Sequence, residues 1–142
     1  MTLLSGVKDF LGFDHYRKQD LRERLNLIGV AETHILWKIR LGHHVHGGTQ
    51  EPLETALVGQ DAICLLGNWI RGGEFEAFHG LPAFQQLRDA HQKFHDIGEL
   101  IVCKLREGDS QIAAALFEGE YTQSLRDIIH ALTVINKHLQ EL

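Results

Sequence analysis

The sequence of 142 residues carries 14 Lys and Arg against 19 Asp and Glu, so its formal charge at pH 7 is −5. This length suits one compact domain, and the acidic balance without a long basic run argues against nucleic acid or an anionic membrane as a partner. Two cysteines are too few for a disulfide framework, and we find neither a signal-peptide pattern nor an apolar run of membrane-spanning length, so we expect a cytoplasmic protein.

Four helical segments are predicted, because the two prolines and the glycine clusters fall between long stretches that can form helices. The first segment has residues three or four apart on one face: Leu27, Val30, His34, Trp37 and Leu41. The second segment, between Thr49 and Gly72, has a similar spacing: Leu53, Leu57, Asp61 and Cys64. Polar residues therefore interrupt both faces.

The third and fourth segments have more regular stripes. From about Leu81 the stripe is Phe84, Leu87, His91, Phe94, Gly98, Ile101 and Leu105. A stop at Gly108 and an N-cap at Asp109 precede the last stripe, which is Leu125, Ile128, Leu132, Ile135 and Leu139. Antiparallel neighbours with short connections bury such stripes, and the sequence shows no alternating strands and no internal repeat. We therefore predict an all-α fold, an antiparallel four-helix bundle.

His91 and His95 lie one helical turn apart in the third segment. Residues four apart share one side of a helix, with Cβ atoms roughly 6 Å apart, so both imidazoles can reach one metal ion. Taken alone, the pair is more typical of solvated or hydrogen-bonded side chains than of a metal site. His34 and Cys64 are further candidates, because each occupies the expected inner face of another helix, where an unpaired imidazole or thiol is costly.

Three separated stretches, THILWKIRLG (33–42), DAICLLGNW (61–69) and LPAFQQLRDAHQKFH (81–95), resemble in order and spacing the chemoreceptor zinc-binding (CZB) domain. That family's pattern is a His one turn before a Trp, a Cys followed by x-x-Gly-x-Trp, and a final His-x-x-x-His. The resemblance covers residues 18–142 and leaves residues 1–17 as an N-terminal extension. It implies a bundle that pairs as a homodimer, with a zinc site between helices whose ligands are His34, Cys64, His91 and His95.

Zinc with four protein ligands has a complete tetrahedral shell and no position for water, so we expect no enzymatic activity. A di-iron carrier fits less well, because such bundles need bridging carboxylates, and the turn with His91 and His95 offers none. A carboxylate that accepts an N–H bond from a ligand would balance the positive site. Asp61, where the family pattern often has Asp, is the candidate for this outer role, and an ordinary surface acid is the alternative.

Weaker expectations concern residues around the ligands. Trp37 and Trp69 fall on apolar faces and are expected to pack around the site. Cys103, within LIVCKL, is expected to be a small buried hydrophobic residue. A Gly-flanked segment contains three more histidines: His43, His44 and His46. We expect this segment to be a solvated linker and not a second metal site.

The resemblance implies a signalling role, because such domains belong with chemoreceptors or with cyclic-di-GMP signalling proteins. There they respond to zinc level or, through the zinc-bound Cys, to oxidants such as hypochlorous acid. We therefore expect a zinc-binding regulatory sensor in which Cys64 is redox-sensitive and the signal leaves through protein contacts. No output domain is visible, so the chain resembles a stand-alone member or a fragment of something longer. The alternative is an interaction module in which zinc is only a structural staple.

Overall fold

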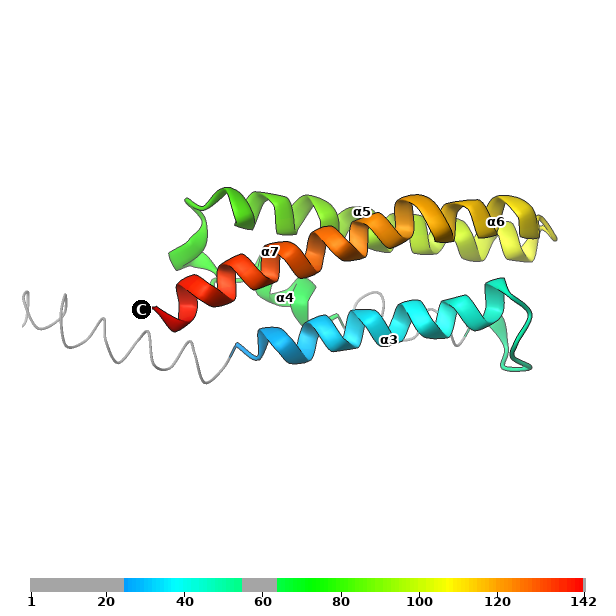
Figure 1. Ribbon diagram of the computed structural model, residues 1–142, viewed down its shortest axis with the longest axis horizontal. Coiled ribbons are helices and arrows are strands. Elements are labelled where there is room, and N and C mark those ends of the chain that lie inside the picture. The colour runs from blue at the N-terminus through cyan, green and yellow to red at the C-terminus, as the bar shows by residue number, and fades with distance from the viewer. Residues whose placement is uncertain (1–24, 55–63, 142) are drawn as a thin grey trace, which may run out of the picture.

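The computed structural model describes residues 25–54 and 64–141, and these form an all-helical structure (Figure 1). Its elements are α3 (Leu27–Val45), α4 (Leu65–Arg71), a 3₁₀ turn (Glu76–Phe78), α5 (Pro82–Arg106), α6 (Ser110–Leu116), a π-helical stretch (Phe117–Tyr121) and α7 (Thr122–Gln140). The predicted extension, residues 1–17, and the predicted helix positions Leu57 and Asp61 lie outside the described residues. Within the described ranges, no helix has both the length and the apolar character needed to cross a membrane.

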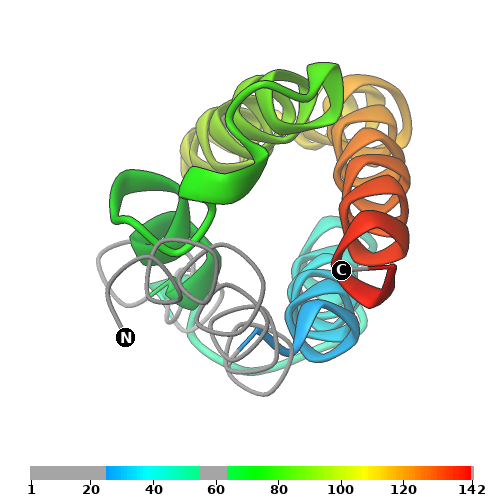
Figure 2. The ribbon, with the colours of Figure 1, turned by 90° about the vertical axis from the view of Figure 1, so that its left-hand side faces the viewer.

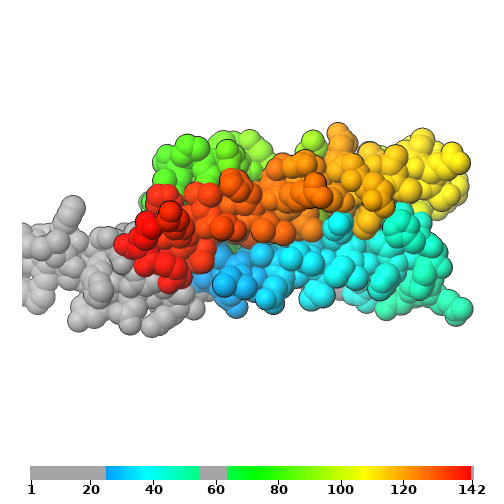
Figure 3. All heavy atoms as spheres, in the orientation of Figure 1, coloured from blue at the N-terminus to red at the C-terminus, as the bar shows by residue number. Residues whose placement is uncertain are grey.

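The α6 helix, the π-helical stretch and α7 follow one another without a break and form one long helical segment, the α6–α7 rod. Four helical segments therefore pack together. Viewed end-on, α3, α4, α5 and the α6–α7 rod surround a common interior (Figure 2). The α5 helix packs along α6 and α7 and runs opposite to them, and α3 packs mainly on α7 (Figures 1 and 3). The predicted all-α fold of four packed helices is therefore confirmed.

Local signals explain where the helices begin and end. Pro82 opens α5, where a missing N–H costs nothing. Gly108 follows α5 with a φ of 79°, a left-handed conformation that favours glycine. Asp109 then caps α6, because its Oδ1 accepts a hydrogen bond of 3.3 Å from the N–H of Ile112. The predicted stop and cap are both confirmed.

The hydrophobic core is built largely from the stripes of α5 and α7. Every predicted stripe position of α7 is buried: Leu125, Ile128, Leu132, Ile135 and Leu139. On α5, the stripe from Phe84 to Ile101 is buried, including His91 and Phe94. The prediction for Cys103 was wrong, because its side chain is exposed. At about 100° per residue, Cys103 lies some 200° around the helix from the buried Ile101. The apolar residues next to Cys103 in the sequence therefore did not show that its side chain lies on the exposed face of α5.

The second helix is shorter than predicted over the residues that the structure describes. Residues 49–52 are irregular, and α4 begins only at Leu65, with Cys64 as its N-cap in an extended conformation (φ −70°, ψ 111°). Pro52 is one reason for the irregular start, because the residue before a proline is disfavoured in helical geometry. Cys64 therefore lies at the N-terminus of a short helix and not inside a long one.

The π-helical stretch was not predicted, and it places two aromatic rings in the core. The hydroxyl of Thr122 donates to the carbonyl of Phe117, five residues back, at 2.7 Å. Phe117 packs closely on α3 at Gly42, where a Cβ atom would lie only 2.9 Å from the tip of the ring. Tyr121 is fully buried and stacks on Phe94 of α5, with ring centroids 4.5 Å apart. This stacking joins the last rod to the helix that carries His91 and His95.

Candidate metal centre

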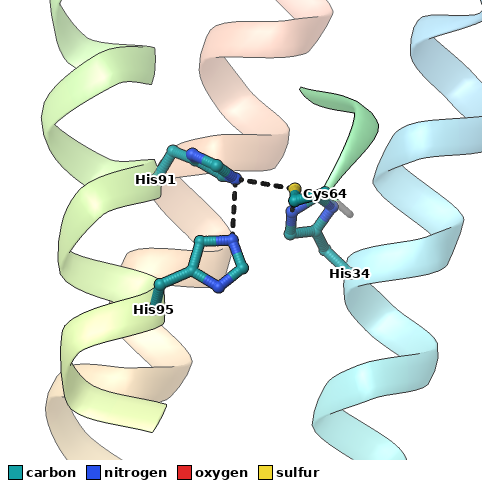
Figure 4. A group of neighbouring side chains, drawn as sticks. All are labelled: His34, Cys64, His91 and His95. Atoms are coloured by element: carbon teal, nitrogen blue, oxygen red, sulfur yellow. Dashed lines mark hydrogen bonds between the residues drawn. The ribbon is translucent and has the colours of Figure 1, made fainter. Parts of the chain in front are cut away.

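Three elements bring four potential metal ligands together in the interior of the bundle (Figure 4). His34 comes from α3, Cys64 from the N-cap of α4, and His91 and His95 from successive turns of α5. Their potential ligand atoms all lie within 4.8 Å of one another. In the part of the chain that the structure describes, this is the one group of three or more His, Cys, Asp or Glu side chains that could hold a metal ion.

The distances between the donor atoms suit a single tetrahedral ion. Zn–N bonds near 2.0 Å and a Zn–S bond near 2.3 Å place two nitrogens about 3.3 Å apart and nitrogen and sulfur about 3.5 Å apart. The Nε2 atoms of His91 and His95 are 2.9 Å apart, and the Sγ of Cys64 lies 3.2 Å from Nε2 of His91. Sγ lies 3.7 Å from Nε2 of His34. For these three pairs of atoms, adjustments of a few tenths of an ångström would give the spacing of bound zinc, so the four residues form a potential zinc site.

The backbone orients His34 for metal binding. Its Nδ1 lies 2.6 Å from the carbonyl oxygen of Val30, one turn earlier in α3. Because a carbonyl only accepts hydrogen bonds, Nδ1 carries the proton and donates. Nε2 then keeps its lone pair and faces the sulfur of Cys64 (Figure 4). Metal-bound histidines commonly donate their other N–H in this way, which fixes the ring.

The buried imidazoles are neutral at pH 7. Burial, together with repulsion from the neighbouring His95 and His34, lowers the pKa of His91 to about 3. Burial also lowers the pKa of His34, although the hydrogen bond to Val30 opposes this shift. A neutral imidazole offers its lone pair to a metal, whereas a protonated one does not. The interior therefore holds both rings in the form that zinc requires.

Cys64 is affected by burial in the opposite way. Burial raises the pKa of the Cys64 thiol, while the backbone N–H groups of Gly67 and Leu66 and the charge of Arg71 oppose the rise. The thiol is consequently protonated before a metal arrives, and zinc must displace that proton to gain a thiolate ligand. The bound set of Zn²⁺, three neutral imidazoles and one thiolate would have a net charge of +1.

Aromatic rings support the histidines. The ring of Phe94, fully buried, has its centroid 5.3 Å from that of His34 and 5.6 Å from that of His95. Trp37, partly buried, meets the His34 ring edge-on with centroids 4.7 Å apart. Trp69 is 8% exposed and packs on Phe75. The predicted packing role of the two tryptophans is confirmed, with Trp37 in direct contact with the ring of His34.

Gly67 allows α4 to approach His91. A Cβ atom at this position would lie 3.3 Å from Cε1 of His91 and 3.0 Å from a terminal nitrogen of Arg71. The flexible arginine can move aside, but a metal-bound imidazole cannot do so without loss of coordination geometry. Glycine at this position of the Cys-x-x-Gly-x-Trp motif therefore leaves room for the ring of His91. The sequence pattern did not reveal this steric role.

We predict that Gly67→Ala has opposite effects on zinc binding and on the metal-free fold. The added methyl group should displace His91 and weaken zinc affinity about tenfold, comparable with loss of an outer partner. Alanine is also the better helix former by about 1 kcal/mol, so the metal-free protein should be no less stable. Titration against a chromophoric chelator measures the first effect, and thermal unfolding without metal measures the second.

Gly119→Ala is the matched control, because a Cβ atom at Gly119 would meet nothing within 4 Å. That variant should bind zinc as the parent protein does. Unchanged zinc affinity in Gly67→Ala would show that the close approach to His91 has no effect on the site.

Among the described residues, none of the linker histidines joins the four. Asp61, the candidate outer carboxylate, lies outside the described residues. The linker histidines prove to be helical: His43 and His44 end α3, and His46 is its C-cap. His46 instead lies 3.6 Å from Glu118.

Arg71 is the residue near the site that sequence reasoning missed. It lies seven residues after Cys64 and four after Gly67, which is two turns and one turn along α4, so helical spacing alone could have indicated it. Its guanidinium donates to the side-chain oxygen of Asn68 at 2.8 Å, and its charge acts on both Cys64 and His91.

A closed set of three histidines and one cysteine between packed helices is typical of a helical metal-binding module. Residues 34–102 match the family model of the chemoreceptor zinc-binding domain, and the match spans all four residues. Residues 34–102 therefore belong to the chemoreceptor zinc-binding domain family, whose domains are signalling or binding modules and are not known as catalytic domains. No curated protein and no solved structure matches the chain.

Proposed function

We propose that the chain is a regulatory sensor in which His34, Cys64, His91 and His95 hold one zinc ion and Cys64 responds to oxidants. One observation carries the proposal. Cys64 is the only one of the four residues whose ligand atom is readily oxidised, and it is the N-cap of a helix of only seven residues. The three imidazoles come from α3 and α5, which have 19 and 25 residues. Loss of the thiolate would therefore release a short element while the long helices keep their packing.

The chemistry of the response is a two-electron oxidation. The thiolate sulfur of Cys64 attacks the chlorine of hypochlorous acid, hydroxide leaves, and water then displaces chloride from sulfur. The net change converts thiolate and hypochlorous acid into a sulfenic acid and chloride. A sulfenic acid is a poorer ligand than a thiolate, so three imidazoles remain to hold the metal. Zinc level itself is the second input that this site supports, since loss of zinc would release the same short helix.

The output of the sensor would be a change in protein contacts in the cytoplasm. The match to the chemoreceptor zinc-binding domain supports a signalling output, and we propose a chemoreceptor or a cyclic-di-GMP signalling protein as the partner that reads the change. A complete four-donor set supports the absence of enzymatic activity, because no coordination position remains for substrate.

We also propose that the chain pairs as a homodimer of parallel or near-parallel bundles. Large apolar side chains lie exposed on α3, among them Ile28, Leu36 and Ile39 at 64%, 63% and 49% exposure, and these support burial against another surface. Light scattering across a wide dilution range should give twice the mass of the chain. A monomer mass at every concentration would contradict the proposal.

Limited oxidation of the zinc-loaded protein tests the sensor function. Substoichiometric hypochlorous acid should modify Cys64 first, release zinc in proportion, and leave most of the helix content in place. Mass spectrometry, a zinc indicator and circular dichroism measure these three quantities on the same sample. Cys103, which is exposed, is the internal reference for unselective oxidation. Oxidation of Cys103 or Met1 with Cys64 intact would overturn the redox input and leave zinc level as the input.

The alternative function is an interaction module in which zinc is a structural staple, and the closed donor set is the observation that favours it. A competing chelator separates the two functions. A sensor should give up zinc and stay largely helical, whereas a stapled module should unfold when the metal leaves. The extensive core between α5 and α7, away from α4, supports the first outcome.

A further inference from the structure

Cys64 is buried but not sealed from the surface. It is 2% exposed and His34 is 1% exposed, yet both line an open pocket of about 300 Å³ between α3 and α4. This pocket is large enough for a small molecule and too small for a folded partner. It therefore offers a route by which a small reagent can reach the ligand set from the α3–α4 side.

The described walls of the pocket are apolar or uncharged. Val30, Trp37, Leu66 and Trp69 supply much of the lining, and none of the described residues that line it is Asp, Glu, Lys or Arg. Arg71 acts electrostatically on Cys64, but it is not among the lining residues. A molecule in the pocket therefore exchanges water for indole and aliphatic surface.

Such a lining discriminates between reagents by charge. A carboxylate that loses water without gaining a partner pays a free-energy penalty of several kcal/mol, whereas a neutral amide of the same size pays roughly 1–3 kcal/mol. Attraction to a site of charge +1 recovers only part of the penalty, about 3 kcal/mol at 6 Å with an effective dielectric constant near 20. The lining itself therefore favours uncharged reagents, and attraction to the site opposes this preference for an anion.

We propose that this pocket is a binding site for small uncharged electrophiles, which it admits to the sulfur of Cys64 while it excludes anions of equal size. The proposal deepens the proposed function, because it names the class of reagent that the sensing residue can meet, and it rests on that function only for its biological meaning. Neutral hypochlorous acid belongs to the admitted class, and its conjugate anion belongs to the excluded class.

Two alkylating reagents of nearly equal size and different charge test the pocket. In each, sulfur donates an electron pair to the methylene carbon, the C–S bond forms, the C–I bond breaks and iodide leaves with its electron pair. Iodoacetamide is neutral and iodoacetate is an anion. Both react with the zinc-loaded chain, and mass spectrometry follows Cys64 and the exposed Cys103 in the same molecules. At each cysteine we take the ratio of the iodoacetamide rate to the iodoacetate rate. The normalised ratio is the value at Cys64 divided by the value at Cys103, which removes the intrinsic reactivity of the two reagents.

We expect the normalised ratio to be at least about 10, which corresponds to 1.4 kcal/mol of discrimination. A ratio of one or less would overturn the proposal. Because the measurement follows alkylation and needs neither oxidation nor signalling, a failure here leaves zinc release on oxidation untouched. Conversely, a high ratio with no zinc release after oxidation would overturn the proposed function and not the pocket.

Variants of Thr33, an exposed residue of α3 that lines the pocket, sharpen the test. Thr33→Trp should fill the pocket and slow both reagents at Cys64, with Cys103 unchanged. Thr33→Lys should raise the rate of iodoacetate selectively and lower the normalised ratio towards one. Thr133→Trp, the same substitution at an exposed threonine of α7 outside the lining, is the matched control and should leave the rates at Cys64 unchanged. Equal rates in Thr33→Trp and the parent protein would overturn the proposal.

Discussion

Cys64→Ala should lose tight zinc binding, whereas the parent protein should carry one zinc ion per chain. The substitution removes the only thiolate from a set that otherwise contains neutral imidazoles, and with it the only negative charge among the four ligands. Loss of an outer hydrogen-bond partner alone costs roughly 10- to 100-fold in metal affinity, so loss of a ligand should cost more. Elemental analysis after exchange into a weak chelator measures the stoichiometry.

The same chain supplies the control for this substitution. Cys103→Ala removes an identical thiol from the exposed side of α5 and should keep a full zinc ion. The weak chelator removes metal held loosely by exposed histidines such as His43. Iron in place of zinc, two metals per chain, or a full complement of zinc in Cys64→Ala would each contradict the proposed ligand set.

Phe94→Ala should destabilise the protein and loosen the site at the same time. The ring is fully buried, lies next to the imidazoles of His34 and His95, and stacks on the ring of Tyr121. Truncation of a buried phenylalanine typically costs about 3–5 kcal/mol in the free energy of unfolding. The imidazoles would also lose the surface that orients them, so zinc affinity should fall beyond the loss of stability. Urea denaturation with and without zinc separates the two effects.

Phe78→Ala is the matched control for this core position. Phe78 is 3% exposed, but its ring contacts Phe75 and none of the histidines that the structure describes. It should lower stability by a similar amount and leave zinc affinity nearly unchanged. If Phe94→Ala fails to fold, Phe94→Leu keeps most of the volume and still removes the flat ring. Zinc affinities that fall equally in the Phe94 and Phe78 variants would contradict a specific role for Phe94.

Helices with an uninterrupted stripe were predictable from the sequence, and helices with polar residues on the inner face were less so. The stripe of α7 and the cap at Asp109 follow from local rules, since each depends on residues within a few positions. The π-helical stretch depends on how Phe117 meets Gly42 across the bundle, which no local pattern encodes. A related error concerns Cys103, for which burial was predicted from its apolar neighbours in the sequence and not from its position around the helix.

For the site, spacing alone connected only His91 with His95, because they share a helix. The convergence of His34 and Cys64 on that pair depends on the packing of separate elements, and it was reached through the resemblance to a family. The distances, the hydrogen bond from His34 to Val30 and the steric role of Gly67 are tertiary features. They could not be predicted from composition, periodicity or motif spacing.

The π-helical stretch also makes the last rod sensitive to its length. Buried residues there recur every four positions, at Ala113, Phe117, Tyr121 and Leu125. In an α-helix of 3.6 residues per turn, each such step drifts by about 40°, so three steps would move the face by about 120°. The wider turns of a π-helix absorb this drift. Insertion of one further residue between Phe117 and Tyr121 would turn everything after it by about 100°, and the face with Ile128 and Ile135 would leave the core. Deletion of one residue would instead leave a spacing of three, which an ordinary α-helix accommodates, and the later face would stay in the core. Substitutions here alter packing locally, but an added residue would alter the phase of the whole C-terminal helix.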